Sequence, residues 1–283
     1  MRQVGRSIGD YSQRGFVVVP GVLGGADLAA ARAEATAICR GEVGEINGVV
    51  RSPSDEDDLT ALSRYLCIHF PHKLSPLLLG FGRLPAVVDA LTDVIGPNVK
   101  MMQSMLFIKA PGKPGLAWHQ DESHIPTRDR SLTAAWIALD DATLANGCLW
   151  VLPGSHRSGV LYPVRDHHDQ RFDPTPEASG FGRSDDDAVA VEVAAGDAVI
   201  FDGYLLHRSF PNRHDGFRRA LVYHYMSAES LLPWFPAGGA EKVATADVRD
   251  VVLVAGHDPH AYKGIVDVMR PWLRPDDGLL AGM

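Results

Sequence analysis

The run "WHQDESHIPTRDRSLTAAWIALDDATLANGCLWVLPGSH", residues 118–156, carries the pattern that decides the fold. It holds two short apolar segments, at residues 132–139 and 147–152, separated by Asp, Asn and Gly, which favour turns. Similar short apolar or alternating segments occur at residues 99–109, 188–201 and 218–228. Many short strands at modest spacing, divided by turn residues, predict an antiparallel barrel or jelly roll.

The regions that flank these strands have helical signals. Residues 16–19 predict a short strand, residues 25–40 a helix followed by Gly41, and residues 84–95 a helix ended by Gly96 and Pro97. Residues 51–60 predict a solvated loop, and the tail from residue 260 predicts a short helix stopped by prolines. The expected fold is mainly β with helices packed outside the core. We find no internal repeat or boundary, so we expect one domain spanning residues 1–283.

Composition limits the classes of function. The chain of 283 residues has a net charge of −8 and no concentrated run of Lys and Arg, which argues against a nucleic-acid partner. No segment is long enough to span a membrane, and the amino-terminal run lacks a signal-peptide pattern. Cys39, Cys67 and Cys148 are far apart and odd in number, which favours buried thiols in a reducing cytosol. We therefore expect a cytoplasmic protein; the oligomeric state is not readable from the sequence.

Two side chains that bind metals stand two residues apart, at His119 and Asp121. Residues i and i+2 of a strand point to one face, so both could reach one ion at the mouth of a barrel. This pair alone is weak evidence for a metal site, because a surface histidine and a helix-capping aspartate would give the same sequence pattern. His207, at the end of a later apolar strand, supplies a third ligand. Two histidines and one carboxylate are typical of non-haem Fe(II) oxygenases.

The segments "MLFIKAP", "WHQDESH", "NGCLWVLPGSH" and "HRSFPN", followed by "RRALVYHYMS", occur in this order. Together they resemble the phytanoyl-CoA dioxygenase family of Fe(II)/2-oxoglutarate oxygenases, from about residue 15 to 227. The resemblance implies a double-stranded β-helix, which is a cupin-like jelly roll. It also implies Fe(II) held by His119, Asp121 and His207, with 2-oxoglutarate and O2 as co-substrates.

The resemblance also implies which residues contact 2-oxoglutarate. Arg218 would hold the distal carboxylate, because a guanidinium grips a carboxylate with two parallel hydrogen bonds. Arg219 is the alternative, and on a strand only one of the two can face the pocket. Ser209, Met105 and Trp136 match further co-substrate contacts, although Met and Trp on a strand often only fill a core.

One feature departs from the family pattern. Some relatives place a lysine upstream of the second helix, and this chain has "RYLCIHFPHKLSP" there. His69, His72 or Lys73 is the candidate replacement. Residues 162–187 form a long charged stretch without periodicity, which is typical of a disordered segment or of a lid, and we expect a lid over the site.

These features predict an enzyme that hydroxylates an unactivated C–H bond of a small metabolite, with natural-product biosynthesis as the candidate setting. Asp121 favours hydroxylation over halogenation, because related halogenases lack this carboxylate. Desaturation, epimerisation and ring closure stay open. The alternatives from other classes are a jelly-roll metal-binding protein without turnover and a cupin-type enzyme that does not use 2-oxoglutarate.

Overall fold

The computed structural model describes residues 8–233 and 246–276, and two antiparallel sheets form its core. The large sheet has the order β1-β10-β5-β12-β3-β2-β14, and β13 also pairs with β3. Its strands are β1 (Phe16–Val19), β2 (Tyr65–His69), β3 (Val99–Lys109), β5 (Thr133–Ala138), β10 (Ala198–Asp202), β12 (Arg218–Ser227), β13 (Val252–Ala255) and β14 (Trp272–Pro275). The small sheet has the order β4-β11-β6-β9. Its strands are β4 (Leu116–His119), β6 (Leu149–Val151), β9 (Val189–Val191) and β11 (His207–Ser209).

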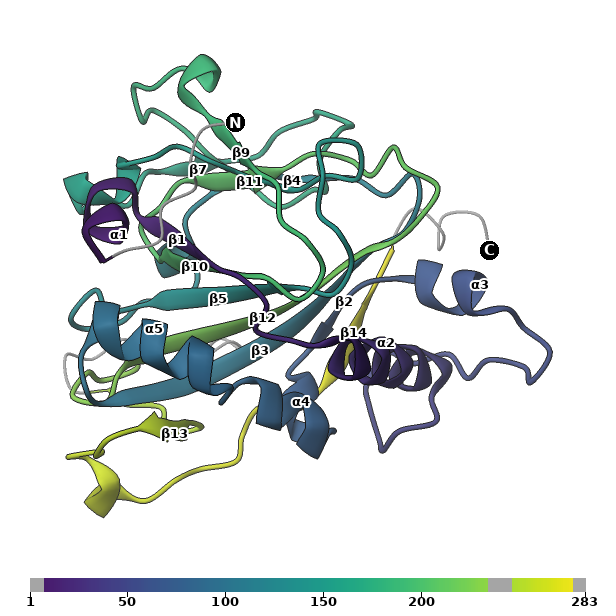
Figure 1. Ribbon diagram of the computed structural model, residues 1–283, viewed down its shortest axis with the longest axis horizontal. Coiled ribbons are helices and arrows are strands. Elements are labelled where there is room, and N and C mark those ends of the chain that lie inside the picture. Colours follow the sequence, from purple (N-terminus) through teal and green to yellow (C-terminus); the bar gives the residue numbers. More distant parts are fainter. Residues whose placement is uncertain (1–7, 234–245, 277–283) are drawn as a thin grey trace.

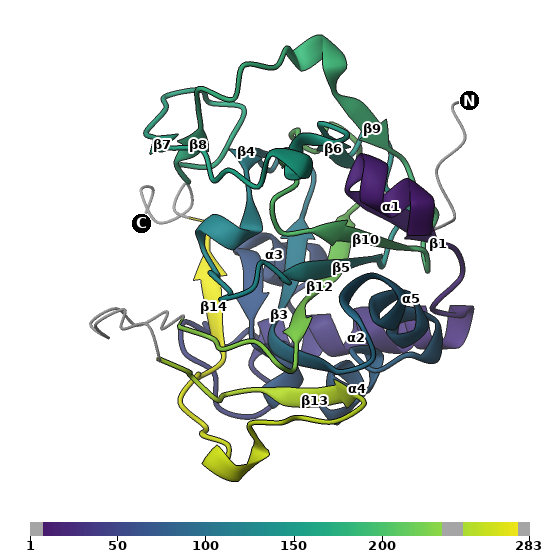
Figure 2. The ribbon, with the colours of Figure 1, turned by 90° about the vertical axis from the view of Figure 1, so that its left-hand side faces the viewer.

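The two sheets face each other, and helices cover the outer face of the large sheet (Figure 1). The α-helices among the described residues are α1 (Ile8–Arg14), α2 (Gly25–Arg40), α3 (Asp58–Ser63), α4 (Pro76–Phe81) and α5 (Pro85–Ile95). Of these, α2, α4 and α5 cover that face, whereas α1 lies beside β1 and α3 lies near the opposite edge of the sheet (Figure 1). The turned view of Figure 2 shows α2, α4 and α5 on the side of the large sheet away from β4 and β6. This is the jelly roll, or double-stranded β-helix, that the sequence predicts.

Alternation along the strands of the large sheet produces two separate cores. Trp136 and Val222 pack between the two sheets, whereas their neighbours Ile137 and Leu221 pack on the helix side. Successive side chains of a strand point to opposite faces, so one strand serves both cores. The central strands are consequently buried on both faces, and the space between the sheets holds the site described below.

Two tyrosines fasten helix α4 to the sheet. The hydroxyl of Tyr223 donates to the Leu78 carbonyl at 2.6 Å, and that of Tyr225 donates to the Gly82 carbonyl at 2.9 Å. Both side chains are fully buried, so neither carbonyl has access to water in place of the hydroxyl. The segment before α5 is thereby held on the sheet by directional bonds as well as by apolar contact.

Two local expectations were wrong. The tail forms the strand β14 against β2, not a helix, because the free edge of β2 can accept an antiparallel partner. Prolines are tolerated in such an edge strand, where no further ladder is required. The expected loop at residues 51–60 ends early, because Asp57 caps α3 by accepting the amide of Thr60.

The three cysteines are buried and unpaired, as expected. Burial raises the pKa of Cys148 to about 12. No helix among the described residues is long and apolar enough to cross a bilayer.

We predict that Tyr223→Phe lowers the free energy of unfolding by about 1–2 kcal/mol, because it leaves a buried carbonyl without a donor. Urea denaturation followed by circular dichroism measures this change. Tyr262→Phe is the matched control, since Tyr262 is 83% exposed. Equal stability of the two variants would show that the Tyr223 hydroxyl contributes nothing.

Candidate functional site

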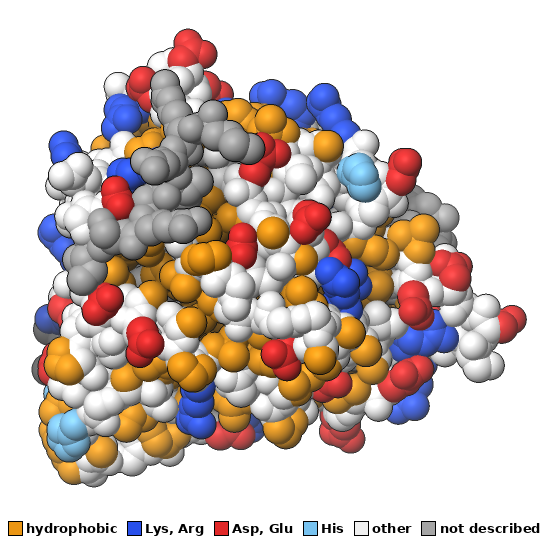
Figure 3. Space-filling model, viewed as in Figure 1, with side chains coloured by type: hydrophobic (Ala, Val, Ile, Leu, Met, Phe, Trp, Pro, Cys, Tyr) orange, Lys and Arg blue, Asp and Glu red, His pale blue; other side chains and the backbone are white. Residues whose placement is uncertain are grey.

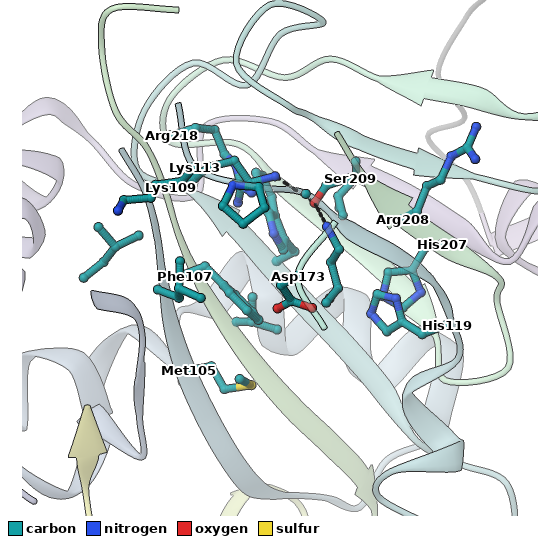
Figure 4. Close-up of a pocket in the computed structure, with 18 of the residues that line it drawn as sticks. Met105, Phe107, Lys109, Lys113, His119, Asp173, His207, Arg208, Ser209 and Arg218 are labelled. Carbon is teal, nitrogen blue, oxygen red and sulfur yellow. Dashed lines mark hydrogen bonds between the residues drawn. The ribbon is translucent and has the colours of Figure 1, made fainter. Parts of the chain in front are cut away.

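A cavity of about 110 Å³ lies between the two sheets. Strands from both sheets line it: β4 and β11 on one side, β3, β5 and β12 on the other. Figure 4 shows its labelled residues, with His119 and His207 on one side and Arg218 and Lys109 on another. The cavity therefore has a histidine end and a cationic end.

The two histidines face each other across a strand pair. His119 ends β4 and His207 begins β11, and these two residues are partners in the antiparallel ladder. Their ring centroids lie 4.0 Å apart. Nδ1 of His119 lies 2.8 Å from the Ala117 carbonyl, and Nδ1 of His207 lies 2.9 Å from the Leu205 carbonyl. Each carbonyl fixes its ring with the proton on Nδ1, which leaves Nε2 free to bind a metal.

Asp121 completes the group, although not from a strand. β4 ends at His119, and Asp121 starts a 3₁₀ turn, Asp121–Ser123. Oδ1 of Asp121 lies 3.9 Å from Nε2 of His119 and 3.6 Å from Nε2 of His207. One ligand atom from each of the three residues falls within 4.8 Å of the others. Two nitrogens and one carboxylate oxygen at this spacing fit a single divalent cation.

Charge states in this group suit metal binding. Burial lowers the pKa of His119 to about 3, with the neighbouring His207 acting in the same direction. Burial raises the pKa of Asp121, but His207, His224 and His119 together hold it below its usual range. Metals bind neutral imidazoles and ionised carboxylates, and these are the forms that the two pKa shifts favour for His119 and Asp121.

His224 is a residue that the sequence reading missed. Its Nε2 lies 3.2 Å from Oδ2 of Asp121, so it holds the oxygen that faces away from His119 and His207. His224 lies on β12, where alternation from Arg218 through Val222 brings it to the face that lines the cavity. The alternation of side chains along this strand is the sequence feature that could have identified His224.

The side chains of Arg218 and Arg219 have different surroundings. Arg219 forms a bidentate ion pair with Asp140, with both N–O distances at 2.8 Å. Arg218 instead lines the cavity, with its guanidinium carbon 5.6 Å from the centre of the Trp136 ring. Its Nε is buried without a hydrogen-bond partner among the residues that the structure describes, and burial lowers the pKa of the guanidinium to about 10. An unpaired buried guanidinium is a suitable partner for a carboxylate ligand.

The other expected co-substrate residues also line the cavity. Met105, Trp136 and Ser209 all contribute to its wall. The Ser209 hydroxyl accepts hydrogen bonds from Lys109 Nζ at 2.8 Å and from the Leu116 amide at 3.3 Å. Lys109, on β3, is a second residue that the sequence reading missed.

The three candidates for the upstream lysine have other partners. His69 stacks on Trp272 at 3.9 Å, His72 Nδ1 lies 2.6 Å from the Ser104 hydroxyl, and Lys73 forms ion pairs with two aspartates. None of the three is among the described residues that line the cavity.

The insertion at residues 162–187 contributes one residue, Asp173, to the wall of the cavity. It contains β7 (Val164–Arg165), β8 (Glu177–Ala178) and the 3₁₀ turn Asp185–Asp187. Asp173 lines the cavity and pairs at 3.0 Å with Arg274 of β14, which also lines it. The insertion and the tail strand thus meet at the wall of the cavity.

The pattern described as phytanoyl-CoA dioxygenase (PhyH) matches residues 11–220. The chain belongs to this family. Phytanoyl-CoA dioxygenase 1 of Oryza sativa subsp. japonica is 36% identical over 166 residues, which cover 57% of each chain. Matches to curated relatives from rice, Arabidopsis thaliana and Caenorhabditis elegans span only 51% to 57% of their lengths.

Solved structures share the PhyH-family fold. A non-heme monooxygenase, ThoJ, superposes with a TM-score of 0.68 at 24% identity, covering 96% of this chain and 91% of ThoJ. The epimerase SnoN, in complex with Fe3+, alpha ketoglutarate and nogalamycin RO, has a TM-score of 0.62 at 20% identity, covering 94% of this chain and 96% of SnoN.

We predict that His224→Gln weakens Fe(II) binding about 10-fold to 100-fold, because groups that orient a ligating carboxylate contribute affinity of this order. Anaerobic calorimetry measures the dissociation constant directly. His168→Gln, which changes an exposed histidine of the insertion, is the control. An unchanged dissociation constant in His224→Gln would remove His224 from the metal site.

Proposed function

We propose that this protein is an Fe(II)/2-oxoglutarate-dependent dioxygenase that hydroxylates an unactivated C–H bond of a small metabolite. The observation that carries the proposal is one cavity that combines His119, Asp121 and His207 with Arg218, whose buried Nε has no hydrogen-bond partner in the described part of the chain. Membership of the PhyH family supports the same assignment.

Each residue has a role in this proposal. His119, Asp121 and His207 would hold the iron, and Arg218 would bind the distal carboxylate of 2-oxoglutarate beside Ser209, Trp136 and Met105. The bound iron supplies the activation of O2 that oxidises 2-oxoglutarate and substrate together. The fixed histidine rings and the guanidinium are preorganised, so little reorganisation is required when the ligands bind.

Hydroxylation, as opposed to another oxidative reaction, is also part of the proposal. A substrate held differently beside the same iron would undergo desaturation, epimerisation or ring closure, and SnoN is an epimerase with this fold. A retired metal-binding protein and a cupin-type enzyme without 2-oxoglutarate are the competing classes. The retained triad and the free Arg218 favour a working 2-oxoglutarate site over both.

We propose a free small molecule of natural-product biosynthesis as substrate, and neither a nucleic acid nor a membrane as partner. Acidic and basic side chains are interspersed on the face shown in Figure 3, and the net charge is −8. The cytoplasmic location and the single domain spanning residues 1–283 stay predictions.

The first test is an anaerobic titration of Fe(II)-loaded protein with 2-oxoglutarate, followed by visible absorption. We expect a weak charge-transfer band near the green as the 2-oxo acid chelates the iron. Absence of the band in protein that holds one iron would favour a metal-binding protein without turnover or a cupin-type enzyme that does not use 2-oxoglutarate. Formation of succinate in the presence of O2 then screens candidate substrates, with CoA thioesters included.

We predict that Arg218→Lys weakens 2-oxoglutarate binding about tenfold or more, because lysine keeps the charge but loses the two parallel hydrogen bonds. The same titration gives the dissociation constant. Arg219→Lys is the matched control, since Arg219 is engaged by Asp140 outside the cavity. Equal effects of the two variants would contradict the role of Arg218.

We also propose that residues 162–187 form a lid, held over the entrance by the Asp173–Arg274 ion pair. Asp173→Asn should speed amide hydrogen exchange across the insertion, because the ion pair tying it to β14 is lost. Asp166→Asn, at an exposed position of the same insertion, is the control. Unchanged exchange in Asp173→Asn would show that the pair does not hold the insertion.

A further inference from the structure

Lys109 is a buried cation at the end of the cavity opposite the histidines. It lies on β3, where alternation places Met105, Phe107 and Lys109 along the cavity wall. The side chain is only 6% exposed. Its ammonium donates to the Ser209 hydroxyl at 2.8 Å and to the Phe210 carbonyl at 2.6 Å. An ammonium has three N–H donors, so these contacts leave one unused.

Lys109 lies directly beside Arg218. The two residues are partners in the β3–β12 ladder, so their side chains share one face. Like charges opposite each other in a sheet repel, and both of these are removed from water. Burial lowers the pKa of Lys109 well below its ordinary value, and the charge of Arg218 acts in the same direction.

No acidic partner compensates the two cations among residues 8–233 and 246–276. Neither Lys109 nor Arg218 forms an ion pair there, and the acids in their vicinity are engaged elsewhere. Asp140 binds Arg219, and Asp173 binds Arg274. Adjacent buried cations without an anion are costly, which indicates that the cavity is shaped for an anionic ligand.

We propose that Lys109 is a second recognition residue for the distal carboxylate of the co-substrate, so that Lys109 and Arg218 together select a 2-oxo dicarboxylate over a 2-oxo monocarboxylate. This inference rests on the proposed function. A carboxylate has two oxygens and about four lone-pair sites, enough to accept from a guanidinium and an ammonium together. Its negative charge offsets the repulsion between the two cations, an advantage that a neutral ligand end lacks.

The test compares two ligands that differ only at the distal end. Fe(II)-loaded protein without oxygen is titrated by calorimetry with 2-oxoglutarate and with 2-oxopentanoate, which has the same five-carbon chain but no second carboxylate. Lys109→Met should weaken 2-oxoglutarate binding about tenfold or more and change 2-oxopentanoate binding less than about twofold. Equal weakening of both ligands, or no weakening, would overturn the proposal.

Lys109→Gln separates charge from hydrogen bonding. Glutamine can still donate to Ser209 or Phe210 but carries no charge, so we expect it to behave like Lys109→Met. Recovery of 2-oxoglutarate affinity in Lys109→Gln would overturn the proposal. It would show that Lys109 only positions Ser209 through a hydrogen bond. Lys100→Gln is the matched control: Lys100 is a buried lysine on the same strand that donates to the Ala228 and Ser230 carbonyls.

Arg218→Gln provides a test that leaves Lys109 in place, should the Lys109 variants fail to fold. If Lys109 recognises the distal carboxylate, this variant still prefers 2-oxoglutarate over 2-oxopentanoate by about fivefold or more. Loss of all preference would overturn the proposal. Failure of the unaltered protein to bind either acid would instead overturn the proposed function, and this inference with it.

Discussion

The pairing of β4 with β11 is the constraint on which the site depends. Because His119 and His207 are ladder partners, the hydrogen bonds of the small sheet set the separation of their rings. Side-chain rotation is then limited by the carbonyls of Ala117 and Leu205, each two residues before its histidine. The main chain therefore prepares the two nitrogen ligands, and only Asp121 requires a separate turn and a separate support, from His224.

The cavity is electrically polarised by the sheet that faces this pair. β12 carries Arg218 at its start and His224 six positions later, both on the inner face. One strand thus contributes a cation at one end of the cavity and a support for an anionic ligand, Asp121, at the other. A ligand with a chelating end and an anionic end matches this arrangement in one orientation only. The unequal charges at the two ends of the cavity therefore fix the direction in which such a ligand binds.

Much of this could be predicted from the sequence, for reasons of periodicity. The short apolar runs predicted the strands, and the spacing of His119, Asp121 and His207 predicted the metal group. The family resemblance singled out Arg218 and Met105, and alternation along the same strands leads from Arg218 to His224 and from Met105 to Lys109. The roles of His224 and Lys109 were overlooked, because the role of a histidine or lysine on a strand cannot be assigned until its neighbours across the sheet are known. The tail helix was wrong because pairing with a distant strand edge overrode local signals.

The position of β14 in the chain has a consequence for the order in which the protein forms. This strand supplies Arg274 to the wall of the cavity, yet it pairs with β2, about two hundred residues earlier in the chain. During synthesis, the strands of the small sheet and the histidine pair therefore emerge before Arg274. The candidate metal ligands are thus present in the nascent chain before the last residue of the cavity wall has been added.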